Sequence, residues 1–357
     1  MRTRIALSLW QGMTVDRWRQ ALTVCKDEQA LLQLSAKQWR QLGLPAGLLA
    51  GRVSLRDRRV DQVMEWLQAP QHQLITWQDP AYPPLLQELS SPPLMLYARG
   101  QVQLLKHRQV AIVGSRRATP RALEFAHQLA ADLAAVGVVV TSGLALGVDT
   151  AAHRGALAGG GQTVAVMANG LGQVYPLVNQ RLAKQIEQQG VLLSEQPPWM
   201  EPRAQLFPQR NRIVSGLCQA VVVVQAQRRS GSLITARLAL EQNREVMAVP
   251  GDAGCVQAQG CHDLLKEGAA LVENADDVLQ CLGWQQSESP ATNGKSRTTE
   301  ALSLQEQQLL SCIDSSGTAL DRIYQRYSGD GADVVLGLSQ LELKGLICRS
   351  AHGYSRY

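Results

Sequence analysis

Arginine, asparagine and small hydroxyl residues gather at three points in the middle of the chain: Gly114-Ser115-Arg116, Arg210-Asn211-Arg212 and Ser230-Gly231-Ser232. A guanidinium group can pair with two phosphate oxygens at once, and it keeps its charge at any physiological pH. Hydroxyl and backbone N–H groups donate hydrogen bonds to the same oxygens. No obvious nucleophile–base pair accompanies these residues, so they favour phosphate binding over catalysis.

The first cluster stands where a strand is expected to lead into a helix. An apolar run at Val110–Val113 precedes Gly114. Thr119 can cap the helix that follows, and Pro120 suits its first turn. Free backbone N–H groups and the helix dipole at such a start attract an anion. We therefore expect a phosphate-binding domain whose ligand is a nucleic-acid strand.

The same unit of strand, turn and helix recurs along residues 108–283. The predicted strands are Val110–Val113, Val138–Thr141, Thr163–Met167, Val191–Ser194, Ala220–Val224 and Glu245–Val249. The predicted helices between them are Pro120–Val136, Val148–Ala158, Asn179–Gln189 and Ser232–Gln242. Nearly continuous Val, Ala and Ile in the strands suit a parallel sheet covered on both faces. The sequence therefore predicts an α/β fold with a doubly wound, mostly parallel sheet and a ligand crevice at the carboxyl ends of its strands.

Further polar turns are expected to reach this crevice, at Ser142-Gly143 and Asn169-Gly170. Asp149 and His153 lie four residues apart on one predicted helix and resemble a catalytic pair. Such a pair more often caps and orients the helix, and we prefer that interpretation.

The segment from Phe207 to Arg212 is interpreted as a loop over the crevice. Phe207 could stack on a base, which is worth about 1–3 kcal/mol. The alternatives are that Phe207 belongs to the core, and that Arg210 or Arg212 forms an ion pair with Glu195 or Glu201.

Charge is distributed unevenly along the 357 residues, although the net charge is only +5. Residues 108–250 hold 14 Lys and Arg against 8 Asp and Glu, whereas residues 251–357 hold 8 against 14. The first imbalance fits a face that binds a polyanion, but it also fits an ordinary solvated surface. Charge alone does not decide between the two.

The 7 cysteines include no CxxC pair, which fits a reducing cytosol better than a disulfide framework. Cys255, Cys261 and His262 lack a second ligand pair, so buried thiols are favoured over a metal site, and no cofactor is expected. The N-terminus lacks the features of a signal peptide. The most apolar run, Leu133–Val148, has 16 residues, fewer than the roughly 20 that a membrane span needs. These features predict a cytoplasmic protein without a membrane segment.

Smaller domains are expected on both sides of the α/β domain. Residues 1–70 are predicted to form a helical domain, SAM-like or helix-hairpin-helix-like, and residues 71–107 an extended connector. Residues 284–302 are polar and rich in Ser and Thr, as in a linker. Residues 303–357 show three helices and a hairpin near His352-Gly353, as in a winged helix. From residue 304 on there are 5 basic against 6 acidic residues, which disfavours DNA reading by this domain.

Four longer segments together resemble the DNA processing protein A (DprA/Smf) family. They are Val113–Arg117, Ser142–Asp149, Phe207–Leu217 and Ser230–Ala236. The resemblance covers roughly residues 70 to 283 strongly and the flanking domains more loosely. Each motif alone is weak evidence for the family, whereas the order and spacing of the four together are specific to it.

The resemblance implies an extended Rossmann-like domain that binds single-stranded DNA in a basic pocket. It implies a protein without enzymatic activity that passes the strand to the RecA recombinase in natural transformation. Arg181, just after Asn179, joins the arginines already named. The DNA-binding residues implied are Gly114, Ser115, Arg116, Ser142, Gly143, Asn169, Arg181, Phe207, Arg210, Asn211, Arg212, Ser230, Gly231 and Ser232.

The resemblance also implies self-association through His262, Leu265 and Leu271, although both leucines could instead lie in the core. Gln225 departs from the Glu that is common in the family, and it is not expected to touch the pocket.

Two enzyme classes remain as alternatives. A phosphoribohydrolase-like enzyme would carry a PGGxGT stretch, but Pro250-Gly251 continues as Asp-Ala-Gly. A dinucleotide-dependent oxidoreductase would continue Gly114-Ser115-Arg116 into a GxGxxG fingerprint, which is missing.

Overall fold

The computed structural model describes residues 1–284, 303–314, 318–327, 331–344, 346–350 and 353–356. It divides into two compact units, Met1–Gln286 and Ser287–Tyr357. The predicted linker, 284–302, lies outside the described residues except for Trp284. None of the helices in the described ranges is long and apolar enough to cross a membrane.

A nine-stranded sheet forms the centre of the first unit, with the order β1-β2-β6-β5-β4-β3-β7-β8-β9. The strands from β6 to β9 in this order run parallel, whereas β1 and β2 are antiparallel to their neighbours. The prediction of a doubly wound, mostly parallel sheet is confirmed. The strands are β1 His72–Thr76, β2 Met95–Gly100, β3 Gln109–Val113, β4 Val139–Ser142, β5 Thr163–Val166, β6 Val191–Ser194, β7 Ala220–Val223, β8 Glu245–Ala248 and β9 Ala270–Leu271.

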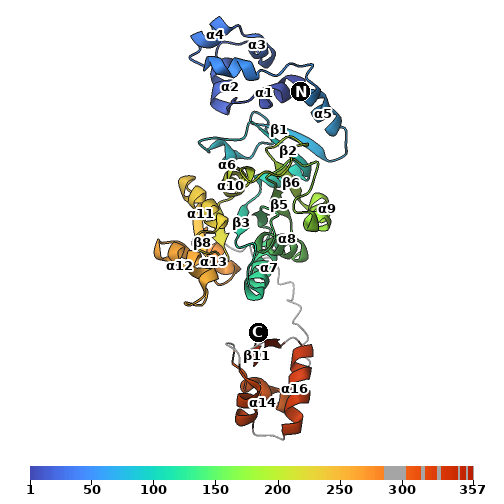
Figure 1. Ribbon diagram of the computed structural model, residues 1–357, viewed down its shortest axis with the longest axis vertical. Helices are drawn as coiled ribbons and strands as arrows, with labels where there is room; N and C mark the ends of the chain where they lie inside the picture. The colour runs from blue at the N-terminus through green and yellow to red at the C-terminus, as the bar shows by residue number, and fades with distance from the viewer. Residues whose placement is uncertain (285–302, 315–317, 328–330, 345, 351–352, 357) are drawn as a thin grey trace. The chain divides into compact units, whose positions relative to one another are not determined.

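Helices cover both faces of this sheet because alternate apolar residues of each strand point to opposite sides. In β3, Ala111 and Val113 join one buried cluster, whereas Val110 and Ile112 join another. Helices α7, α8 and α13 pack on the second cluster, and α7 and α8 lie side by side (Figure 1). The helices of this unit that follow β1 are α6 Pro84–Gln87, α7 Pro120–Ala135, α8 Val148–Ala158, α9 Gln180–Gln189, α10 Leu206–Gly216, α11 Gly231–Glu241, α12 Gln259–Lys266 and α13 Ala275–Cys281.

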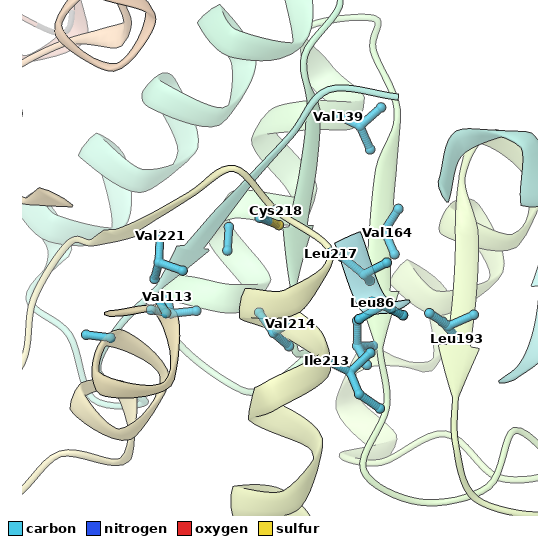
Figure 2. Close-up of a cluster of buried hydrophobic side chains, with 14 of the residues drawn as sticks. Leu86, Val113, Val139, Val164, Leu193, Ile213, Val214, Leu217, Cys218 and Val221 are labelled. Atoms are coloured by element: carbon cyan, nitrogen blue, oxygen red, sulfur yellow. The ribbon is translucent and has the colours of Figure 1, made fainter. Parts of the chain in front are cut away.

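Residues 71–107, expected to be an extended connector, belong to the sheet and its core. They supply β1 and β2 at the sheet edge and the short helix α6. Leu86 of α6 is fully buried and lies beside Ile213 of α10 in the same cluster (Figure 2). A Cβ added to Gly216 would lie 2.9 Å from a methyl group of Leu86, which shows how closely the two helices approach. The proline pairs suggested a surface path, but Leu86 and Leu89 between them are buried in the core.

The N-terminal helices pack against β1 and β2, where they form the blue group in Figure 1. Trp66 contacts Tyr97 of β2 edge to face, and Arg4 forms an ion pair with Asp79. Their bounds are α1 Arg2–Ser8, α2 Val15–Leu22, α3 Glu28–Gln33, α4 Ala36–Gln41 and α5 Arg58–Trp66.

Within the domain expected to be SAM-like or helix-hairpin-helix-like, the segment Gln41–Gly51 ends in a 3₁₀ helix, η1 (Ala46–Gly51). Its carbonyl groups at Pro45 and Leu48 accept hydrogen bonds from the indoles of Trp39 and Trp10. These partly buried contacts support a structural role for this segment.

The segment that carries Phe207, Arg210 and Arg212 is a helix, α10, rather than the expected loop. Pro208 falls in the first turn of α10, where backbone N–H groups have no partner within the helix, so proline is tolerated there. The apolar residues Ile213 and Val214 then bury the second half of the helix against the sheet.

The second unit is a winged helix, as predicted. Ser303 and Glu306 form a capping box at the start of its first helix, and Glu306 also pairs with Lys344. The hairpin residue His352 lies outside the described part of the chain. The elements are α14 Leu304–Ser311, α15 Leu320–Arg326, α16 Gly331–Leu343, β10 Ile347–Ser350 and β11 Gly353–Arg356.

We predict that Leu86→Ala lowers the free energy of unfolding by about 2–5 kcal/mol, because it leaves a cavity between α6 and α10. Gln87→Ala, on the exposed side of the same short helix, should change it by less than about 0.5 kcal/mol. Urea denaturation of both variants measures the difference. Equal stability of the two variants would show that residues 71–107 are only a connector.

Candidate nucleic-acid interface

An open cleft of about 840 Å³ lies at the carboxyl ends of β3 and β7. These two strands are parallel neighbours, and successive strands are added on opposite sides of them, β4 beside β3 and β8 beside β7. This is where a doubly wound sheet leaves room for a ligand. Ten of the predicted DNA-binding residues line it, namely Gly114, Ser115, Arg116, Gly143, Phe207, Arg210, Asn211, Ser230, Gly231 and Ser232.

The turn after β3 is held in place by Gln225, which follows β7. The Ser115 N–H donates to the Gln225 carbonyl at 2.7 Å. The side-chain amide of Gln225 accepts from the Thr119 N–H at 2.9 Å and donates to the Thr119 hydroxyl at 3.2 Å. A glutamate would lack the donor, so the glutamine suits this pairing. Gln225 itself does not line the cleft, as expected, but it fixes the turn that carries Arg116.

Gly147 allows the turn after β3 to approach the start of α8. Its φ of +79° lies in the left-handed region, and a Cβ there would lie 2.2 Å from the Ser115 carbonyl oxygen. That carbonyl instead accepts a hydrogen bond from the Val148 N–H at 3.2 Å. The glycine motif after β4 therefore serves close backbone packing beneath the cleft.

Arg116 is exposed, and its guanidinium lies over the ring of Phe207, 5.3 Å from the ring centroid. Phe207 is half-buried and meets Tyr175 edge to face, with 5.8 Å between the ring centroids. A cation above an aromatic face leaves the outer donors of the guanidinium available to a phosphate. Phe207 thus lines the cleft and is not a core residue.

Arg210 also lines the cleft, but its guanidinium is buried and already bonded. The side chain is 7% exposed, and its Nη1 donates to the carbonyl groups of Gly143, at 2.6 Å, and Val166. Burial lowers the pKa of Arg210 to about 10, against the opposing effect of Asp149, so the group remains a cation at neutral pH. Its position corrects the expectation of a free phosphate ligand. Arg210 instead joins α10 to the ends of β4 and β5.

Arg212 lies on the other side of α10, because two residues span about 200° around a helix. Its Nη2 bonds both carboxylate oxygens of Glu195 at 2.6 Å, and it does not line the cleft. The ion-pair alternative considered for Arg212 is therefore the one that the structure contains. Of the three arginines of the predicted cradle, Arg116 and Arg210 line the cleft and Arg212 does not.

Three further predicted residues lie outside the cleft. The Ser142 hydroxyl donates to the Ile112 carbonyl at 2.7 Å within the sheet. The buried amide of Asn169 donates to the carbonyl groups of Gly170 and Gln173. Arg181 is exposed on α9. Ser142 thus joins β4 to β3, and the side chain of Asn169 holds its own loop after β5.

Among the cleft residues that the sequence did not predict as DNA-binding are Arg117, Tyr175 and Arg229. Both arginines are exposed and adjacent in sequence to predicted residues, Arg117 to Arg116 and Arg229 to Ser230. This adjacency could have predicted them. The described residues that line the cleft include four arginines and a single carboxylate, Asp149. The cleft is therefore cationic.

Asp149 and His153 do not act on each other as a catalytic pair. Asp149 accepts hydrogen bonds from the N–H groups of Gly143 and Ala145, at 3.1 and 3.3 Å, and burial raises its pKa. His153 pairs through Nδ1 with the Thr163 hydroxyl at 2.7 Å, and burial lowers its pKa to about 3, so it is neutral. Both residues hold backbone and strand contacts, as preferred above.

The residues expected to mediate self-association lie at another edge of the sheet. Leu271 belongs to the edge strand β9 and is 49% exposed. Leu265 is partly buried against the core, and His262 bonds the Gly251 carbonyl at 2.9 Å. Leu265 is thus partly a core residue, as the alternative interpretation held, whereas Leu271 is not.

A family model for DNA recombination-mediator protein A matches residues 73–283, and a model for the DprA winged helix domain matches residues 293–353. The chain belongs to the DNA recombination-mediator protein A family. The match begins at β1, which agrees with the place of residues 71–107 in the sheet. Protein Smf of Escherichia coli strain K12 is 37% identical over 321 residues, which cover 89% of this chain and 86% of that protein.

Similar proteins of this family have solved structures. DNA processing protein A of Streptococcus pneumoniae superposes with a TM-score of 0.67 at 34% identity, over 78% of this chain and 97% of that chain. DNA processing protein A of Helicobacter pylori, described for its single-stranded DNA binding mode, gives 0.54 at 33% identity, over 59% and 95%. The α/β fold is thus shared with proteins that process DNA.

We predict that Arg210→Ala destabilises the protein by about 3–5 kcal/mol, because it leaves two buried carbonyl groups and the Asp149 carboxylate without their cation. Arg212→Ala should cost less, about 1–3 kcal/mol, since Glu195 keeps part of its surface in water when its partner is removed. Chemical denaturation compares the two variants. A larger loss for Arg212→Ala would contradict this assignment of roles.

Proposed function

We propose that this protein is a single-stranded DNA-binding mediator and not an enzyme. The observation that supports this most is the cleft at the carboxyl edge of the sheet, with four arginines, one carboxylate and the stacked pair of Arg116 and Phe207. Such a surface suits a polyanion with accessible bases. The single-stranded DNA binding described for the Helicobacter pylori relative agrees with it.

Three exposed arginines are the proposed phosphate ligands: Arg116, Arg117 and Arg229. The hydroxyl groups of Ser115 and Ser230 beside them can donate to the same phosphates, whereas the N–H groups of these two serines are bonded to the carbonyls of Gln225 and Gln227. Arg210 contributes a fixed positive charge beneath the strand without being free to move. Phe207 supplies a face on which a base can stack.

The wider role proposed is protection of incoming DNA and loading of the RecA recombinase on it during natural transformation or recombination. This rests on membership of the family and on the cationic cleft. We further propose that the protein acts in the cytoplasm as a homodimer that uses the edge formed by His262, Leu265 and Leu271.

We predict that Arg116→Ala weakens binding of a labelled single-stranded oligonucleotide about tenfold at moderate salt. The slope of log affinity against log salt should become shallower by about one ion, because one phosphate contact is lost. Arg117→Ala and Arg229→Ala should act in the same direction. Fluorescence anisotropy across a salt series measures both quantities.

Arg181→Ala is the matched control, since Arg181 is exposed in the same domain but lies outside the cleft. It should leave affinity and slope unchanged. Wild-type binding by Arg116→Ala, or binding that ignores salt, would reject the cleft as the DNA site.

We also predict that the wild-type protein speeds assembly of a RecA filament on single strands coated with single-strand-binding protein. Arg116→Ala should lose this effect and Arg181→Ala should keep it, because loading requires the strand in the cleft. RecA ATP hydrolysis reports filament assembly. DNA binding without faster assembly would remove the recombinase role and leave the binding role intact.

A further inference from the structure

The two sides of the cleft differ in chemistry. The exposed arginines follow β3 and β7, whereas the loops after β4 and β5 carry exposed apolar side chains. Four residues define this apolar rim, with exposed fractions of 45% for Leu146, 44% for Tyr175, 63% for Leu177 and 71% for Val178.

Hydrogen bonds from one buried asparagine hold the two loops of the apolar rim together. The side-chain amide of Asn179 donates to the Leu144 carbonyl and to the Thr150 hydroxyl, each at 2.9 Å. Thr150 in turn donates to the Ala145 carbonyl at 2.6 Å. The position of these loops is therefore set by the fold.

The apolar rim continues directly from the wall of the cleft. Ala145 and Tyr175 line the cleft, and Leu146 and Leu177 follow them closely in the chain. Tyr175 contacts Phe207, which in turn lies under Arg116. A path of aromatic and apolar side chains thus leads from the phosphate-binding side to the opposite edge.

A nucleic-acid strand has the same division, with charged phosphates on one side and weakly polar bases on the other. If its phosphates meet the arginines, its bases face the other wall. Only an unpaired strand can offer its base faces, because a duplex stacks and pairs them internally. Grouped exposed apolar residues beside a charged groove mark a contact surface and are not needed by the core.

We propose that the apolar rim binds unpaired nucleobases and gives the cleft its preference for single strands over duplexes. The proposal rests on the proposed DNA-binding function. It adds the surface that distinguishes single strands from duplexes. Removing the apolar contacts should lower affinity without changing the number of phosphates bound.

The test uses a double variant, Leu177→Ser with Val178→Ser, in the full chain. Its probes are an oligo-dT, an abasic oligonucleotide of equal length and a duplex, each titrated across a salt series. We expect about tenfold weaker binding of oligo-dT with an unchanged salt slope, and unchanged binding of the abasic strand and the duplex. Leu146→Ser, on the other loop, should shift oligo-dT binding in the same direction.

Leu240→Ser is the control, since Leu240 is 55% exposed on α11, which belongs to neither loop of the apolar rim. It should bind every probe as the wild type does. Wild-type oligo-dT binding by both rim variants would overturn the proposal, as would an equal loss on the abasic strand. Loss of RecA stimulation with unchanged oligo-dT binding would assign the apolar rim to a protein partner and overturn it too. Failure of the proposed function looks different, since Arg116→Ala would then match the wild type.

Discussion

The buried guanidinium of Arg210 is the interaction on which the cleft depends. A charge removed from water is tolerated only when hydrogen bonds and an opposite charge compensate for it. Arg210 meets this condition through the carbonyl groups of Gly143 and Val166 and through the nearby Asp149. Because those carbonyls end β4 and β5, the contact fixes α10 across the sheet. Phe207 consequently faces the cleft, where Arg116 covers it.

Around this fixed cation, the cleft combines two kinds of arginine. Arg210 supplies a charge that cannot move, while Arg116, Arg117 and Arg229 have exposed side chains that can adjust to a ligand. An immobile charge adds to the local potential, and mobile forks form the hydrogen bonds. This division suits a flexible polymer better than a small substrate that must be held for reaction.

The rest of the first unit supports α10, the helix that shapes the cleft. Two antiparallel strands, β1 and β2, extend the parallel sheet and carry the N-terminal helices through contacts such as that of Trp66 with Tyr97. Leu86 closes the space between this extension and α10 (Figure 2). Helix α10 is therefore held by Arg210 at the ends of β4 and β5, and by Leu86 of α6 on its other contact.

The sequence by itself determined the α/β class, six of the seven parallel strands and four of the helices, because apolar period and turn chemistry are local signals. Turn chemistry and the family resemblance together supplied ten of the residues that line the cleft. The sequence also determined the winged helix. Only the tertiary structure decided the roles of the arginines. Pro208 concealed the helix that places Arg210 and Arg212 on opposite sides, so one is buried against carbonyl groups and the other bonded to Glu195. Whether an arginine is available to a ligand depends on hydrogen-bond partners that are distant in the sequence. A local sequence pattern does not reveal these partners.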